Sequence, residues 1–183
     1  MRVLVTGASG SGATTLGRAL ARELEVAFFD VDDYFWMPTE PPYRQQRTPD
    51  ARVSLLVADL AKVPHSVTSG SVINWGETLE NSFSFIVFLT LPAELRLARL
   101  REREDARFGR ADPGFLEWAA QYDAGSLDVN SRTGDEKWIA QRPCPVLRIE
   151  GDSPVPERVA RVATALSNLH LRPAAPAADE VRR

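Results

Sequence analysis

The residues Gly7-Ala8-Ser9-Gly10-Ser11-Gly12-Ala13-Thr14-Thr15 decide the fold of this 183-residue chain. The apolar run Val3-Leu4-Val5 precedes them, and a helical pattern begins near Thr14. Glycines let the backbone turn tightly and bring its N–H groups up to an oxyanion, and the dipole of a following helix favours negative charge there. The stretch therefore predicts a strand, a glycine loop and a helix N-terminus that together bind an anion.

The spacing of Gly7, Gly12 and Thr14 fits G-x-x-x-x-G-K-[ST], the phosphate-binding P-loop, in which Thr14 would ligate Mg2+. The chain departs from that pattern at one position, because Ala13 stands where the pattern has lysine. The residues expected to bind the phosphates of a nucleotide are Gly7, Ser9, Gly10, Ser11, Gly12, Ala13, Thr14 and Thr15.

A second motif competes for the same residues. The stretch from Val3 to Gly10 resembles the opening of a short-chain dehydrogenase, and Asp30 and Asp32 lie about where a ribose-binding acid would follow, roughly 20 residues on. That family carries a Tyr-x-x-x-Lys pair, whereas neither Lys62 nor Lys137 has a tyrosine four positions earlier. We therefore prefer the P-loop. An NADP-dependent oxidoreductase and a glycine turn that binds nothing remain as alternatives.

Composition excludes several other classes of protein. The net charge of -3 argues against general nucleic-acid binding, because no excess of positive charge is available to displace counterions. Cys144 is the only cysteine and the chain has two histidines, so neither an intramolecular disulfide nor a zinc site is expected. No apolar run approaches the ~20 residues that span a bilayer, and the N-terminus enters a strand directly. We expect a soluble cytoplasmic protein, monomeric or homodimeric, that binds neither membranes nor nucleic acid.

Short apolar runs alternate with helical patterns along the chain. Strands are expected near residues 3–5, 26–29, 66–73, 85–91 and 146–149, and helices near 13–25, 50–62, 92–108, 115–122 and 155–170. Val53, Leu56, Val57 and Leu60 are expected on one apolar face of the second helix. This order predicts an α/β fold with a five-stranded parallel sheet covered by helices on both faces. Residues 1–171 would form one domain, and the Pro- and Ala-rich tail, 172–183, is expected to fray.

Polar residues follow the expected strands. Asp30, Asp32 and Asp33 come after the second strand, and Ser71 and Trp75 come after the third. Because ligands gather at the carboxyl ends of parallel strands, these groups should converge near the glycine loop. Three carboxylates in four residues would repel one another unless a cation or donor hydroxyls compensate them. We interpret them as a site for Mg2+ and a substrate hydroxyl; an ordinary acidic loop is the alternative.

Five arginines recur at helical spacing after the fourth strand. The intervals predict one basic stripe on a single helix that begins after Pro92, made of Arg96, Arg99, Arg103, Arg107 and Arg110. Guanidinium groups on such a stripe could face phosphoryl oxygens and stabilise a charged transition state. A solvated basic face is the alternative interpretation.

Together these motifs resemble the adenylate-kinase-like and shikimate-kinase-like group of small P-loop kinases. Residues 92–103 resemble the Pro-x-x-x-Leu-x-x-x-Arg-x-x-x-Arg stretch of that group, which would put Arg99 over adenine and Arg103 on the transferred phosphate. Phe29-Asp30-Val31-Asp32 resembles the Asp-x-Asp of shikimate kinase, which serves magnesium-bound water and the substrate hydroxyl. Gly151 matches the glycine near the adenine edge, and a mobile lid would occupy about residues 108–134 and contribute Arg132.

The resemblance implies a three-layer P-loop NTPase fold that binds ATP and Mg2+ and transfers the γ-phosphoryl group to a small hydroxyl or nucleotide acceptor. Asp32 would be the base, Asp30 would be a magnesium ligand with Thr14, and Arg103 and Arg132 would act in catalysis. Acceptor-side candidates are Asp30, Asp33, Arg44, Arg47, Ser71 and Trp75. Because Ala13 replaces a lysine, a non-catalytic nucleotide sensor remains the main alternative.

Overall fold

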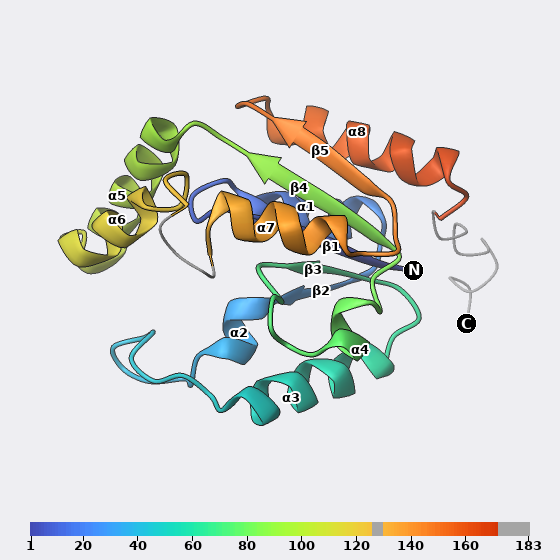
Figure 1. Ribbon diagram of the computed structural model, residues 1–183, viewed down its shortest axis with the longest axis horizontal. Helices are drawn as coiled ribbons and strands as arrows, with labels where there is room; N and C mark the ends of the chain where they lie inside the picture. The colour runs from blue at the N-terminus through green and yellow to red at the C-terminus, as the bar shows by residue number, and fades with distance from the viewer. Residues whose placement is uncertain (126–129, 172–183) are drawn as a thin grey trace, which may run out of the picture.

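Five parallel strands form one sheet in the computed structural model, which describes residues 1–125 and 130–171 (Figure 1). The strands are β1 (Arg2–Gly7), β2 (Ala27–Asp30), β3 (Ser66–Ser69), β4 (Phe85–Thr90) and β5 (Val146–Glu150), in the spatial order β2-β3-β1-β4-β5. Val3 pairs with Val67 on one side and with Phe85 on the other, which puts β1 at the centre of the sheet. Because β3 separates β1 from β2, the order differs from the 3-2-1-4-5-6 order of dinucleotide-binding sheets.

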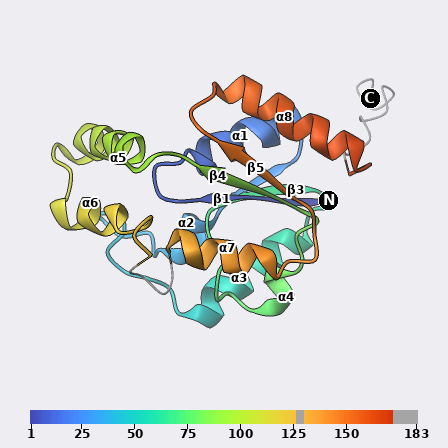
Figure 2. The same cartoon turned by 45° about the horizontal axis from the view of Figure 1, so that its top comes forward.

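Helices cover both faces of the sheet, as Figure 2 shows. Val3 and Val5 point to the face covered by α1 (Ala13–Glu23) and α8 (Val155–Asn168), where Leu16, Leu20 and Val162 complete a buried cluster. Leu4 points to the opposite face, which is covered by α3 (Pro49–Ala61), α4 (Glu77–Glu80) and α7 (Arg132–Ala140). This alternation along β1 follows from the two-residue repeat of a strand, and it explains why the run is apolar throughout.

Two helices project beyond the carboxyl end of β4. They are α5 (Ala93–Phe108) and α6 (Pro113–Ala120), which lie together at the left of Figure 1. Pro92 caps α5, and Gly109, with φ of 77°, ends it in the left-handed conformation that glycine adopts at low cost. A short helix, α2 (Val31–Phe35), follows β2 directly.

The predicted fold class is confirmed, and five of its details are wrong. β3 ends at Ser69 and not at Ile73, because Gly70 turns the chain with φ of 114°. Val57 is 44% exposed and so does not lie on the apolar face of α3. Helices α2, α4 and α7 were not predicted, since α2 and α4 are five and four residues long and polar residues dominate α7. The expected fraying of the tail concerns residues outside the described ones.

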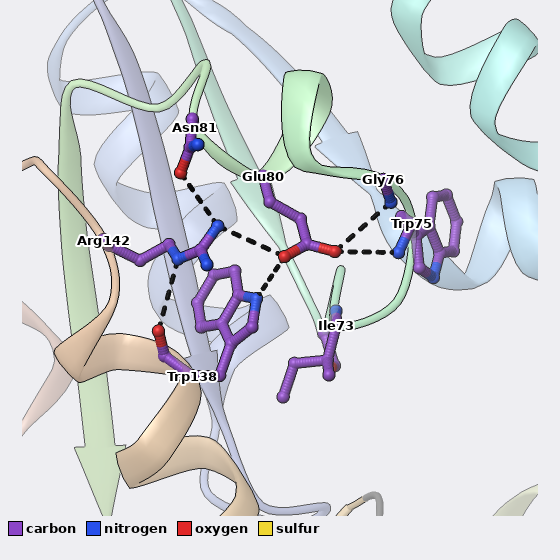
Figure 3. A network of polar contacts seen from close by, with 8 residues as sticks. Ile73, Trp75, Gly76, Glu80, Asn81, Trp138 and Arg142 are labelled. Carbon is purple, nitrogen blue, oxygen red and sulfur yellow. Dashed lines mark hydrogen bonds and ion pairs between the residues drawn. The ribbon is translucent and has the colours of Figure 1, made fainter.

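Helix α7 is fixed to the α4 region by the buried carboxylate of Glu80 (Figure 3). One oxygen of Glu80 accepts backbone N–H bonds from Trp75 (3.1 Å) and Gly76 (3.2 Å). The other accepts from Trp138 Nε1 (2.6 Å) and Arg142 Nη1 (3.2 Å). A buried charge is costly unless it is paired and hydrogen-bonded, and both oxygens of Glu80 meet that condition. The network therefore joins α7 and the residue Arg142 after it to the segment around α4.

In the described part of the chain, no helix combines the length and the apolar character needed to cross a bilayer.

Candidate functional site

The glycine loop connects β1 to α1 at the carboxyl edge of the sheet. Gly10 and Gly12 have φ angles of 82° and 91°, which residues with a side chain rarely adopt. A Cβ atom on Gly10 would lie 2.6 Å from the carbonyl oxygen of Arg96, so the loop packs closely against α5. Gly12 is the N-cap of α1, and it has no side chain that could accept from the first N–H groups of the helix. Those groups are therefore available to an anion.

Ser11 supports the same interpretation from inside the loop. Its hydroxyl is buried, and among the described residues it has no hydrogen-bond partner. A buried hydroxyl without a partner costs free energy, and a phosphate oxygen beside the loop would supply the missing acceptor. The loop as folded thus fits a phosphate chain, as the sequence pattern predicted.

Asp30 lies at the end of β2 and caps α2, accepting a hydrogen bond from the backbone N–H of Asp32 (3.3 Å). Arg18 of α1 approaches its carboxylate to 3.7 Å. Burial raises the pKa of Asp30, and the charge of Asp33 adds to that rise, while the N–H of Asp32 and the hydroxyl of Thr14 oppose it. Thr14 and Asp30 therefore adjoin each other, which suits two groups expected at one magnesium ion.

Asp32 lies on α2, not on the strand. The spacing of Asp30 and Asp32 would place both on one face if the strand continued, but they do not share a strand face, because helix α2 begins immediately after Asp30. Desolvation of the carboxylate raises the pKa of Asp32 to about 6. The charge of Asp30 raises this pKa further, and the charge of Arg103 lowers it. Its side chain keeps access to solvent. The carboxylate is thus near an arginine of α5, with a pKa suited to accepting a proton near neutral pH.

The basic stripe does not have the predicted form. Arg96 is 1% exposed and donates to the carbonyl oxygens of Leu91 (3.2 Å), Ser9 (3.3 Å) and Ala119 (3.4 Å). It also forms an ion pair with Asp123. Arg110 lies beyond the end of α5 at Phe108 and so is not on the helix. The charge repulsion within the predicted stripe is reduced because one arginine faces the core.

The remaining arginines of α5 have different partners. Arg99 forms an ion pair with Asp152 (2.5 Å), the residue after Gly151. Arg103 is exposed and contacts Glu104 of the same helix (2.9 Å). Arg107 donates to the hydroxyl of Tyr43 (2.7 Å) in the proline-rich segment. Gly151 itself follows β5 with φ of 78°, and its N–H bonds to the carbonyl of Thr90 (3.0 Å). Arg99 and Gly151 therefore lie at one edge of the site.

The residues predicted on the acceptor side lie in several separate parts of the structure. Arg47 donates to the carbonyl oxygen of Trp36, and Arg44 is exposed in the same segment. Asp33 is exposed on α2, and Ser71 Oγ accepts a bond from the backbone N–H of Ile73 (3.5 Å). Trp75 is only 4% exposed and packs in the core, with the guanidinium of Arg52 4.9 Å from its ring centre. These contacts do not assign the residues to an acceptor, so their role stays a prediction.

Arg132 is the first residue of α7 and is exposed. Its backbone N–H donates to the carbonyl of Tyr122 (3.0 Å), and this bond joins α7 to the segment after α6. The predicted lid at about residues 108–134 includes α6 and this junction, and part of it, residues 126–129, lies outside the described residues. No group of three or more His, Cys, Asp or Glu residues within the described ranges could hold a metal ion unaided.

Sequence reasoning missed two arginines that adjoin the site. Arg18 pairs with Asp30, and Arg158 of α8 lies beside Gly12 with 5% of its surface exposed. Spacing alone could have drawn attention to Arg158, because it adjoins Val159 and precedes Val162 and Leu166 on the buried face of α8.

The comparisons with known proteins agree with this geometry. The model of a family described as "AAA domain" matches residues 3–111, more than half of the chain. The chain is 40% identical over 174 residues to "Uncharacterized protein YqaC" of Bacillus subtilis, covering 90% of this chain and 96% of that protein. A stretch of 34 residues is 56% identical to the shikimate kinase of Bacteroides fragilis, or 19% of each chain.

The fold is also similar to that of a solved enzyme, "Shikimate kinase from Acinetobacter baumannii in complex with shikimate". The TM-score is 0.60 at 16% identity, over 93% of this chain and 94% of that one. At this identity the likeness concerns the fold alone. The family match and the YqaC relative lead to one conclusion: the chain belongs to this AAA domain family, and its fold is similar to that of shikimate kinase.

Proposed function

We propose that the protein binds ATP with Mg2+ and transfers the γ-phosphoryl group to a hydroxyl of a small molecule or nucleotide. The observation that carries the proposal is that Asp30 adjoins Thr14 at the start of α1, while Asp32, on the helix that follows Asp30, interacts electrostatically with Arg103. A proton acceptor and a cation at the end of a phosphate cradle are the two groups that transfer to a hydroxyl requires.

Each residue has a role in this proposal. The backbone from Gly7 to Thr15 holds the phosphates, Thr14 and Asp30 hold Mg2+, and Arg99 and Gly151 lie along the adenine. The bound metal would neutralise charge on the phosphates. Arg103 and Arg132 stabilise the charge of the transferring group, with Arg132 brought in by a lid at about residues 108–134. The acceptor side comprises Asp30, Asp33, Arg44, Arg47, Ser71 and Trp75.

The proposed reaction is a direct transfer of the γ-phosphoryl group from ATP to the acceptor hydroxyl. The acceptor oxygen forms a bond to the γ-phosphorus, the bond from that phosphorus to the β,γ-bridging oxygen breaks, and ADP leaves. Asp32 orients the acceptor hydroxyl and takes its proton. Most of the rate acceleration would come from positioning and charge neutralisation, because the transition state for phosphoryl transfer needs little covalent help from the protein.

The test is ATP turnover screened against a library of small hydroxyl compounds and nucleosides. We expect one chemical class of acceptor to raise ADP release well above the rate with ATP alone. A thermal-shift panel of ATP, GTP, NADP and NADPH comes first, because a ligand that binds the native state raises its stability by RT ln(1 + [L]/Kd). Stabilisation by NADP and not by ATP would contradict the proposal.

A second function is favoured by Ala13. A chain without the lysine that contacts the outer phosphates could bind nucleotide without turning it over and act as a sensor. Tight ATP binding with no turnover against any acceptor in the library would support the sensor over the kinase.

A further inference from the structure

We infer that Arg158 binds the phosphate chain of the nucleotide and supplies the positive charge that a lysine at position 13 would supply. The inference rests on the proposed function, since it identifies a further residue of the same nucleotide site. Arg158 belongs to α8, more than 140 residues away from the glycine loop in the sequence.

The first observation is its position. Nη1 of Arg158 lies 3.5 Å from the point that a Cβ atom on Gly12 would occupy. Gly12 is the N-cap of α1 and adjoins Ala13. Helices α1 and α8 lie side by side on one face of the sheet in both ribbon views, which brings this guanidinium to the start of α1 (Figures 1 and 2).

The second observation is its burial with one guanidinium nitrogen unpaired. Arg158 is 5% exposed, and among the described residues its Nε has no hydrogen-bond partner. Asp152 attracts it electrostatically, but that carboxylate pairs with Arg99 at 2.5 Å. Burial lowers the pKa of Arg158, and the charge of Arg99 lowers it further. A buried cation of this kind is costly in the free protein, and a bound anion would offset that cost.

The third observation concerns the neighbouring loop. Gly12 has no side chain between Arg158 and the backbone, and Ala13, the first residue of α1, carries no charge. The buried hydroxyl of Ser11 also has no partner among the described residues. A planar guanidinium binds two phosphate oxygens at once, so Arg158 can replace the charge of a lysine and also fix the orientation of the phosphates.

The experiment measures binding by calorimetry to the full chain with Mg2+, using ATP, inorganic tripolyphosphate and adenosine as separate probes. Arg158→Gln should weaken binding of ATP and of tripolyphosphate about 10- to 100-fold, because it removes charged hydrogen bonds, and should leave adenosine binding unchanged. Arg161→Gln, an exposed arginine of the same helix, is the matched control and should change neither.

A double substitution tests replacement directly. Ala13→Lys should restore most of the lost affinity in the Arg158→Gln background and should add less in the wild type, where two cations would repel each other. Melting temperatures of the free variants check folding, and Arg158→Met replaces Arg158→Gln if the glutamine variant does not fold. Failure of both variants to fold would make Arg158 structural and would overturn the inference.

The outcomes separate the two proposals. If the wild type binds ATP and the Kd of Arg158→Gln for ATP is within about twofold of the wild-type value, the inference is wrong and the proposed function stands. An equal loss of adenosine and ATP affinity would likewise overturn it, since the phosphates would then not be the contact. If the wild type binds neither ATP nor tripolyphosphate, the proposed function fails and the inference fails with it.

Discussion

Arg96 of α5 donates a hydrogen bond from Nη1 to the carbonyl oxygen of Ser9 in the glycine loop, at 3.3 Å. The contact joins the helix that carries Arg99 and Arg103 to the proposed phosphate cradle across 87 residues of sequence. Arg96 also donates to the carbonyls of Leu91 and Ala119. One buried side chain therefore connects the segment after β4, helix α6 and the glycine loop.

Arg96→Leu should therefore destabilise the fold by at least about 2 kcal/mol, since several buried carbonyls lose their donor and each orphaned group costs about 1–3 kcal/mol. Urea unfolding gives the free energy. Arg101→Leu, at an exposed position of the same helix, should change it by less than about 0.5 kcal/mol. Equal losses in the two variants would show that the buried network of Arg96 adds nothing.

Ala13→Lys tests the loop. The backbone N–H groups at the start of α1 are expected to carry most of the phosphate binding, so the wild type should bind Mg2+-ATP without a lysine. A lysine at position 13 adds positive charge to a preformed phosphate cradle. The affinity of the variant for ATP should therefore equal or exceed that of the wild type. Calorimetry measures both proteins. A wild type that binds no nucleotide would overturn the P-loop assignment.

Arg103 and Arg99 should have separable kinetic effects. Arg103 interacts with Asp32, so Arg103→Gln should lower kcat by about 10- to 1000-fold with little change in KM. Arg99 pairs with Asp152, so Arg99→Gln should mainly raise KM for ATP, and Asp152→Asn should cause part of the same rise. Steady-state kinetics with the identified acceptor distinguish the cases. Negligible effects of both arginine variants would favour a solvated helix face.

Asp32→Asn keeps the shape of the side chain and removes its negative charge. Phosphoryl transfer should fall at least about 100-fold while ATP still binds, because the acceptor loses the group that takes its proton. Asp50→Asn, which removes an exposed carboxylate from the first turn of α3, controls for the loss of charge and should keep wild-type turnover. Near wild-type transfer by Asp32→Asn would show that another group is the base.

Asp135 should make stability depend on pH. Its carboxylate is 5% exposed and accepts a bond from the hydroxyl of Tyr122 (2.6 Å). Burial raises the pKa of Asp135 from 3.8 to about 6, so its stabilising contribution is complete below about pH 4 and is lost as the pH rises through about 6.

Asp135→Asn removes that titration. The free energy of unfolding of the variant, relative to wild type, should therefore increase by about 2–3 kcal/mol between pH 4 and pH 7, at 1.36 kcal/mol per unit of pKa shift. Urea unfolding at several pH values measures the difference. A difference that stays flat across this range would contradict the raised pKa.

The sequence alone predicted the five strands, the helices α1, α3, α5, α6 and α8, and the glycine loop, because those features depend on local signals. Val3-Leu4-Val5 is apolar on both faces, which is typical of a central parallel strand, and Gly10 and Gly12 occupy positions whose backbone angles favour glycine. Asp30 and Arg99 were predicted the same way, from positions after a strand and along a helix, and their roles stay predictions.

The tertiary structure alone decided which arginines face the site. Arg96 and Arg103 stand in the same helical pattern, yet Arg96 is buried against the loop and Arg103 is exposed near Asp32. Arg158 carries no sequence motif, and it reaches Gly12 only because α8 packs beside α1. Spacing along one helix gives relative directions around its axis, whereas burial and partners depend on what other elements pack against it. For that reason the chain's local pattern predicted the cradle, and the packing of α5 and α8 decided the charges placed around it.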